Sequence, residues 1–215
     1  MSLSVVLVDV HPVVRHGLES LLQQSNFQVV ASEGCADKAF FQVVERVPDF
    51  VIMGLELPGR GTFALTEDIR RRLPLTRIVY FTAHLSDVLI DEALRLGASG
   101  YILKTEPRVR IQAALETLAR GESYFSPEVQ ERLEYDQDSR QYVVKSSSLL
   151  ATLTVRQLQV LRHLVKGDSV KQVAYRMSLS ERAVESHKYR IMQKLGIHDR
   201  VELTRFAIRE GLVSA

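Results

Sequence analysis

Two hydrophobic patterns alternate along the first 120 residues of the chain. Runs that are largely apolar, such as residues 3–8 and 50–53, are typical of strands buried on both faces of a parallel sheet. Between these runs, apolar residues recur at helical spacing, as at Val14, Leu18 and Leu22. Further strands are expected at 28–31, 77–81 and 100–103, and helices at 11–24, 36–47, 63–73, 86–96 and 109–120.

The order of these elements predicts an α/β fold. Five strand–helix units within about 120 residues imply a doubly wound, five-stranded parallel sheet with helices on both faces. A sheet of this kind collects its functional residues at the carboxyl ends of its strands. The first domain is therefore expected over residues 1–121.

Residues 122–148 break the alternation. Ser126 followed by Pro127 has the form of an N-cap and a first helical residue, which predicts a short helix that ends near Tyr135. Residues 136–148 are polar and show no period, so we expect a linker there.

Only helices are predicted beyond Leu153, at 154–165, 170–177, 181–195 and 201–209. Ser180 precedes one of them as an N-cap residue would, and Gly196 lies where a helix end favours a left-handed residue. Residues 178–180 form the short turn of a helix-turn-helix, whose second helix enters the DNA major groove. A small all-α domain is expected over residues 149–215.

Composition narrows the class of protein and its location. Apolar residues make up 46% and charged residues 25% of the 215 residues, as in an ordinary globular chain. No apolar run reaches the roughly 18–20 residues that cross a bilayer, and the first residues lack the basic start of a secretory signal. The single cysteine, Cys35, excludes an internal disulfide and a cysteine-rich zinc site. We expect a cytoplasmic protein that does not contact a membrane.

Charge is distributed unevenly along the chain. The whole chain has a net charge of +2, but residues 150–215 hold 12 lysines and arginines against 6 acidic residues, a net of +6. A concentrated basic unit indicates a polyanionic partner, although a solvated basic surface has the same charge. The spacing of residues within this unit favours the first interpretation.

Fixed spacings run through the basic unit, namely Leu153-Thr154-x-Arg156-x3-Val160-Leu161, Gly167, Val173-Ala174, Leu179-Ser180-x3-Val184-x2-His187 and Lys194-Leu195-Gly196. They resemble the LuxR-type DNA-binding domain, and the first 120 residues resemble the flavodoxin-like receiver domain of bacterial two-component systems. The chain as a whole resembles a response regulator of the NarL/FixJ class. The resemblance implies double-stranded DNA as the partner, residues 181–195 in the major groove, and a homodimer formed through residues 201–209.

The residue types in this motif suit DNA binding. Glu185 departs from the family, in which a basic residue is common at that position. Its carboxylate can accept from the cytosine amino group, or it can pair with Arg182 or a neighbour of Tyr189 and leave the bases untouched. His187 is interpreted as a packing or phosphate-contact residue, because no second metal ligand lies at helical spacing. The candidates for phosphate contacts are Lys171, Arg182, Lys188 and Arg190, and the candidates at base-facing positions are Glu185, Ser186 and Tyr189.

The resemblance also implies a phosphorylation pocket, which here has lost some of its parts. A receiver forms an aspartyl phosphate on a carboxylate after its third strand. Acidic residues after the first strand hold Mg²⁺, and a hydroxyl and a lysine contact the phosphoryl oxygens. Thr82 and Lys104 supply the last two groups. The other positions hold Asp9, Val10 and Gly54, so the nucleophile and one metal ligand are lost.

The pocket is therefore expected to be degenerate, without phosphorylation, a metal or any other cofactor. Glu56 is the nearest substitute acceptor, but it lies two residues beyond Gly54, where the family uses only a backbone carbonyl. A salt bridge between Asp9 and Lys104 is the expected remaining role of both residues.

Three functions compete. The first is a sequence-specific DNA-binding transcription regulator that acts without phosphorylation, under the control of abundance, a protein partner or an unknown ligand. In the second, the receiver sequesters another regulator and DNA binding is secondary. The third is an enzyme that binds a nucleotide, but the chain has neither a G-x-G-x-x-G fingerprint nor a P-loop. The residues favour the first function and argue against an enzyme.

Overall fold

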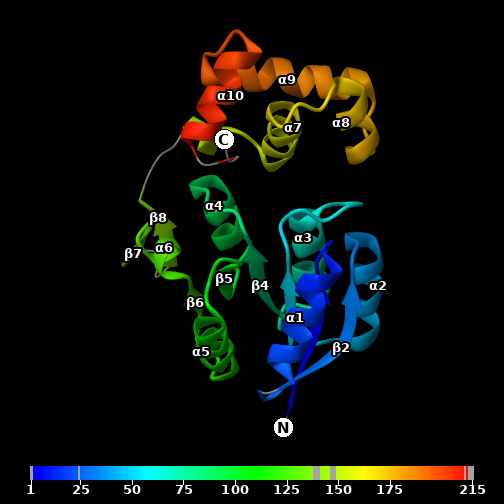
Figure 1. Ribbon diagram of the computed structural model, residues 1–215, viewed down its shortest axis with the longest axis vertical. Coiled ribbons are helices and arrows are strands. Elements are labelled where there is room, and N and C mark those ends of the chain that lie inside the picture. Colours follow the sequence, from blue (N-terminus) through cyan, green and yellow to red (C-terminus); the bar gives the residue numbers. More distant parts are fainter. Residues whose placement is uncertain (1, 24, 138–140, 146–148, 211, 213–215) are drawn as a thin grey trace. The chain divides into compact units, whose positions relative to one another are not determined.

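The computed structural model in Figure 1 describes residues 2–23, 25–137, 141–145, 149–210 and 212. The chain divides into two compact units. The first comprises residues 1–83 and 93–131, and the second comprises residues 84–92 and 132–215. The boundary between the two units at residue 131 lies within residues 122–148, the segment expected to join the two domains.

A parallel sheet with the strand order β2-β1-β3-β4-β5-β6 forms the centre of the first unit, and its six strands all belong to the described residues. The predicted α/β fold is confirmed, and the five expected strands and their helices occur close to the expected bounds. In chain order the elements are β1 (Leu3–Val8), α1 (Pro12–Leu22), β2 (Phe27–Glu33), α2 (Ala36–Arg46), β3 (Phe50–Met53), α3 (Thr62–Arg72), β4 (Arg77–Thr82), α4 (Asp87–Arg95), β5 (Gly100–Leu103), α5 (Arg108–Ala119) and β6 (Tyr124–Phe125).

Successive side chains of the central strands enter two different cores. On β1, Val5 and Leu7 pack with α1 and α5, whereas Val6 lies between them and points to the opposite face. All three side chains are fully buried. Burial on both faces explains why these strands are apolar at nearly every position rather than at every second one.

The end of the sheet contains a strand that the sequence did not indicate. β6 pairs with β5, and Ser126 directly after it accepts a hydrogen bond from the Leu103 amide at 2.9 Å. Ser126 and Pro127 do begin a helix, but the Ser126 hydroxyl does not cap it. This helix, α6 (Pro127–Gln130), ends well before the expected end near Tyr135, because the chain turns into a further strand.

A β-hairpin occupies part of the expected linker. β7 (Leu133–Asp136) pairs antiparallel with β8 (Gln141–Val144). The Tyr135 and Tyr142 rings are packed edge to face, with their centroids 5.4 Å apart. The prediction of a linker over 136–148 was therefore wrong where β7 and β8 lie, and residues 138–140 and 146–148 lie outside the described residues. A cross-strand aromatic pair stabilises such a ribbon, and the short polar strands give no clear period in the sequence.

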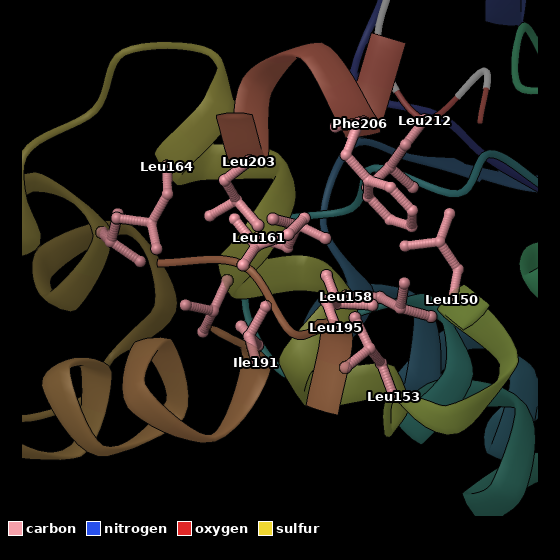
Figure 2. Close-up of a cluster of buried hydrophobic side chains, with 14 of the residues drawn as sticks. Leu150, Leu153, Leu158, Leu161, Leu164, Ile191, Leu195, Leu203, Phe206 and Leu212 are labelled. Atoms are coloured by element: carbon pink, nitrogen blue, oxygen red, sulfur yellow. The ribbon is translucent and has the colours of Figure 1, made fainter. Parts of the chain in front are cut away.

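The C-terminal helices enclose a hydrophobic core of their own, part of which Figure 2 shows. Leu161 of the first helix, Ile191 of the third and Leu203 and Phe206 of the last converge there, together with Leu150 from the short segment that precedes them. The four predicted helices are confirmed. The elements are η1 (Leu149–Thr152), α7 (Val155–Val165), α8 (Val170–Met177), α9 (Glu181–Leu195) and α10 (Arg200–Arg209).

Side-chain caps fix the starts of these helices. The Ser180 hydroxyl accepts from the Ala183 amide at 3.2 Å, and Gly196 ends α9 in the left-handed region at φ 66°, both as predicted. Thr154 and Ser169 each form a capping box with the glutamine three residues later, which the sequence analysis did not anticipate.

The Ser126 hydroxyl provides the first prediction. Replacing Ser126 with alanine leaves the buried Leu103 amide without its acceptor, which we expect to destabilise the first unit by about 1–3 kcal/mol. Urea unfolding measures the loss, and hydrogen exchange at the Leu103 amide locates it. The exposed Ser123, replaced with alanine, is the matched control. An unchanged exchange rate at Leu103 would contradict this role.

Candidate functional site

The carboxyl ends of four parallel strands bring the receiver-type residues together. Asp9 follows β1, Gly54 follows β3, Thr82 ends β4 and Lys104 follows β5. Val8 is in register with Met53 and Thr82 with Leu103, so these strands end at the same edge of the sheet. The parallel topology therefore assembles the pocket that the sequence predicted.

Asp9 is the centre of this pocket and its side chain is only 5% exposed. Its Oδ2 forms an ion pair with Lys104 Nζ at 2.6 Å, which confirms the expected salt bridge. Its Oδ1 accepts from the His11 amide at 2.9 Å and lies 3.1 Å from His11 Nδ1. The guanidinium of Arg15 donates to the Asp9 carbonyl. The buried carboxylate is thus held on both oxygens by groups of this chain.

Gly54 leaves space that the Asp9 carboxylate fills. A Cβ built on Gly54 would lie 2.6 Å from Asp9 Oδ2, closer than real Cβ contacts come. The backbone of Gly54 is itself fixed, because its amide donates to Val8 O at 2.8 Å and its carbonyl accepts from Thr62 Oγ1 at 2.8 Å. A larger residue at position 54 therefore requires the Asp9 side chain to move.

The remaining pocket residues differ in exposure. Thr82 is buried, and its carbonyl accepts from the Lys104 amide at 2.8 Å. Val10 is 42% exposed, and Glu56 also lies on the surface. The Lys104 ammonium lies 5.9 Å from the centre of the Phe81 ring. Asp9 and Lys104 thus form the polar centre of the pocket, with Val10 and Glu56 at the surface.

The second candidate site is built on a helix-turn-helix. α8 ends at Met177 and α9 begins at Glu181, and between them Ser178 adopts a left-handed conformation at φ 53°. The Met177 carbonyl accepts from Arg156 Nη2 at 2.8 Å, which ties the turn to α7. Glycine is the usual residue in a left-handed conformation, and serine is uncommon there. The sequence therefore indicated this turn by its length and not by a glycine.

α9 has one buried stripe and one broad polar face. Val184, Ile191 and Leu195 are buried, as predicted from their spacing. The opposite face is free of the core, and Tyr189 on it is 66% exposed. On α8, the candidate Lys171 is exposed as well. The candidates of α9 are exposed at Arg182, Glu185, Ser186, Tyr189 and Arg190 and half-buried at Lys188.

Glu185 pairs with Lys188, at 3.2 Å, and not with Arg182. The two residues are three positions apart on α9, which places their side chains on neighbouring points of the helix surface. The pair is exposed to solvent, so its contribution to stability is small. Of the two expected partners, Arg182 and a neighbour of Tyr189, the structure therefore shows the second, Lys188.

His187 lies on the border between the two faces of α9. Burial lowers the pKa of His187 below its ordinary value, and the positive charges of Arg156 and Arg190 lower the pKa further. The lowered pKa disfavours the charged imidazolium, which favours packing over a charge contact with phosphate.

Sequence reasoning missed several residues near the two sites. His11 and Arg15 hold Asp9, but only the fold shows that they contact it. On α8, Tyr175 is 88% exposed. It follows the candidate Lys171 by four positions, and this helical spacing was the sequence signal that could have identified it.

Within the described residues there is no cluster of three or more metal-ligating side chains and no helix with the length and hydropathy needed to cross a membrane.

Comparison with known families gives two matches. Residues 5–116 match the response regulator receiver domain. Residues 151–207 match the luxR family of bacterial regulatory proteins. The first match runs from β1 into α5 and leaves out β6, and the second runs from η1 through α7, α8 and α9 into α10.

Individual relatives match over nearly the whole chain. Response regulator UvrY of Escherichia coli is 30% identical over 99% of this chain and 97% of its own length. Oxygen regulatory protein NreC of Staphylococcus aureus is 32% identical over 98% of this chain and 99% of its own. A solved structure of the RcsB response regulator of Salmonella typhimurium, 22% identical, covers 98% of both chains with a TM-score of 0.75 and supports the fold. The chain therefore belongs to the response regulators that combine a receiver domain with a C-terminal luxR-family domain.

Proposed function

We propose that this response regulator is a cytoplasmic transcription regulator that binds specific DNA sequences as a homodimer and acts without phosphorylation of its receiver. The receiver occupies residues 1–121 and the DNA-binding domain residues 149–215, joined by residues 122–148. DNA binding rests above all on one observation, the exposed polar face of α9 directly after the helix-turn-helix turn.

The charge of the C-terminal domain supports this proposal. Its net charge of +6 supplies the sequence-independent attraction to phosphates. Lys171, Arg182, Lys188 and Arg190 are accessible for phosphate contacts, and Glu185, Ser186 and Tyr189 are accessible for contacts with base edges. Solved structures of RcsB, 22–24% identical to this chain, include complexes with DNA and dimers on DNA.

A dimer contact through α10 is supported by its exposed apolar residues. Val201 is 63% exposed and Ile208 is 37% exposed, and the two lie seven positions apart on one face of the helix. Apolar side chains that face solvent at this spacing are suited to meet the same helix of a second copy.

The geometry of the receiver pocket supports independence from phosphorylation. Position 54 has no nucleophile, and the Asp9 carboxylate occupies the space of the lost side chain. The residues present do not fit the Mg²⁺ ion of other receivers either. Val10 has no ligand atom, and the Asp9 carboxylate is neutralised by Lys104. We therefore assign Asp9, Gly54, Thr82 and Lys104 a structural role and infer that the chain is not an enzyme.

Phosphorylation itself can be tested directly. Incubation with acetyl phosphate and Mg²⁺ should leave the intact mass unchanged, because Gly54, the residue directly after β3, has no carboxylate. The variant Val10→Asp/Gly54→Asp restores an acceptor and a ligand and is the positive control. We expect the single variant Gly54→Asp to be less stable than the wild type, since two carboxylates then compete for one space. An acid-labile phosphoryl group on Glu56 would overturn the proposal.

The ion pair predicts a second result. Lys104→Met leaves the Asp9 carboxylate buried without its cation and should lower the free energy of unfolding by on the order of 3 kcal/mol. In Asp9→Asn/Lys104→Met the buried charge is gone, so the loss should be smaller than in Lys104→Met. Urea unfolding of Asp9→Asn, Lys104→Met and the double variant measures this coupling, and Lys38→Met, at an exposed position of α2, is the control. A loss in the double variant equal to the sum of the two single losses would show that the pair is not coupled.

DNA binding provides a third test. Lys188→Ala and Arg190→Ala should weaken binding to specific and scrambled duplexes alike and reduce the salt slope by about one unit each. If Glu185 accepts from a cytosine, Glu185→Ala should lose about 1–3 kcal/mol on the preferred site only. If Glu185 repels phosphates and restrains Lys188, Glu185→Ala should tighten binding to every duplex.

The measurement is DNA affinity of the full chain at two salt concentrations, with Lys38→Ala as the control for total charge. If none of the three α9 variants changes affinity, α9 is not the recognition helix. A full chain that binds no DNA, while its receiver captures another regulator, would favour the alternative function of sequestration.

A further inference from the structure

A cavity of about 270 Å³ opens within the luxR-family domain, and Lys188 is the one candidate DNA-contact residue in its lining. It lies where the end of α7 and the starts of α8 and α10 approach α9. Four apolar side chains form its floor, Leu164, Val170, Met192 and Leu203. Leu164 and Leu203 are buried members of the domain core, and in Figure 2 Leu164 lies on the side of this cluster away from Leu150 and Leu153.

The size and lining of the cavity suit a small apolar group. An apolar cavity of about 150 Å³ is enough to bind benzene, and ligand sites combine a hydrophobic floor with a few polar groups. Val170 and Met192 are half-buried, so they can contact a ligand without a change in the core. A single aromatic ring with a short substituent therefore fits the available space.

The acidic residues at the rim are already engaged. Asp168 Oδ2 lies 2.8 Å from His163 Nδ1 and 3.6 Å from Arg176 Nη1. Asp199 Oδ1 accepts from the Glu202 amide at 2.8 Å and caps α10. Asp168 is paired with basic side chains and therefore does little to repel an anion, whereas Asp199 accepts from a backbone amide and keeps its negative charge at the rim.

One basic residue of the rim is engaged as well. Arg200 Nη2 donates to the carbonyls of Leu164 and Asp168, at 2.9 and 3.2 Å. Lys188 is held more loosely, since its ion pair with Glu185 is exposed and weak. His198 is exposed at the same rim. Lys188 and His198 are thus the two groups that can turn toward an anion.

The start of α8 at the rim adds a positive electrostatic potential. α8 begins at Val170, which lines the cavity, whereas the start of α10 is already capped by the Asp199 carboxylate. The amino-terminal end of a helix favours negative charge. With the apolar floor and Lys188, this potential selects for a ligand that is flat and apolar on one side and anionic on the other.

We propose that this cavity binds a small aromatic carboxylate, with the ring against Val170, Met192 and Leu203 and the carboxylate at Lys188 and His198. Binding itself does not depend on the proposed function. A consequence for DNA does rest on it, because a bound carboxylate would neutralise Lys188, one of the candidate phosphate contacts. The ligand would then weaken DNA binding from within the DNA-binding domain.

The four methionines of the chain make the test specific. Methyl NMR of the full chain, labelled at methionine, reports the cavity through Met192, while the buried Met53 of the receiver is an internal control. The probe is benzoate, and benzamide is its uncharged isostere. We expect a saturable shift of the Met192 methyl with benzoate, at a dissociation constant of about 1 mM for so small a ligand. Benzamide should bind at least about tenfold more weakly.

Three variants complete the experiment. Lys188→Met keeps the apolar stem but removes the charge, and should weaken benzoate binding about tenfold, whereas Lys171→Met, at an exposed lysine outside the cavity lining, should not. Val170→Phe should fill the cavity and abolish the shift. No saturable Met192 shift, equal shifts at Met53, or equal binding of benzoate and benzamide would overturn the proposal. Because these readings are made without DNA, they are independent of whether α9 binds DNA.

Discussion

Burial of the central strands on both faces is the constraint on which the receiver depends. It excludes polar side chains from the length of β1, β3 and β4 and confines the polar residues to the ends of these strands. Since the strands are parallel, their carboxyl ends meet at one edge. Asp9 lies at this edge but is nearly as buried as the core, so its charge requires a partner, and Lys104 provides it.

The same edge brings the Asp9 carboxylate next to Gly54. Because Gly54 has no side chain, the carboxylate occupies the space beside it and pairs there with the Lys104 ammonium. The ion pair joins the ends of β1 and β5 across the sheet.

The DNA-binding domain does not depend on a sheet that is buried on both faces. Its core is small, and α9 contributes only the stripe of Val184, Ile191 and Leu195 to it. The remaining faces of α9 stay open to solvent, which leaves one face for DNA and Lys188 at the rim of a cavity. The carboxylate site that we propose would place the binding of a signal within the DNA-binding domain itself.

The sequence by itself determined the elements whose signal is local. The apolar runs located five strands, helical spacing located the C-terminal helices, and Ser180 and Gly196 marked the ends of α9. The resemblance supplied the positions of the pocket residues and of the recognition helix. Each of these features depends on residues a few positions apart, so a single sequence contains it.

Only the tertiary structure decided the features that depend on distant residues. β6 forms by pairing with β5, and β7 and β8 form by pairing with each other. None of these three short strands has a hydrophobic period of its own from which the sequence could predict it. The Asp9 carboxylate fills the space at Gly54 because strands far apart in sequence end side by side. The preference of Glu185 for Lys188 over Arg182 depends on side-chain geometry that spacing cannot distinguish, since both lie three positions away. Local periodicity specifies elements, whereas pairing, burial of charge and cavities arise from contacts across the fold.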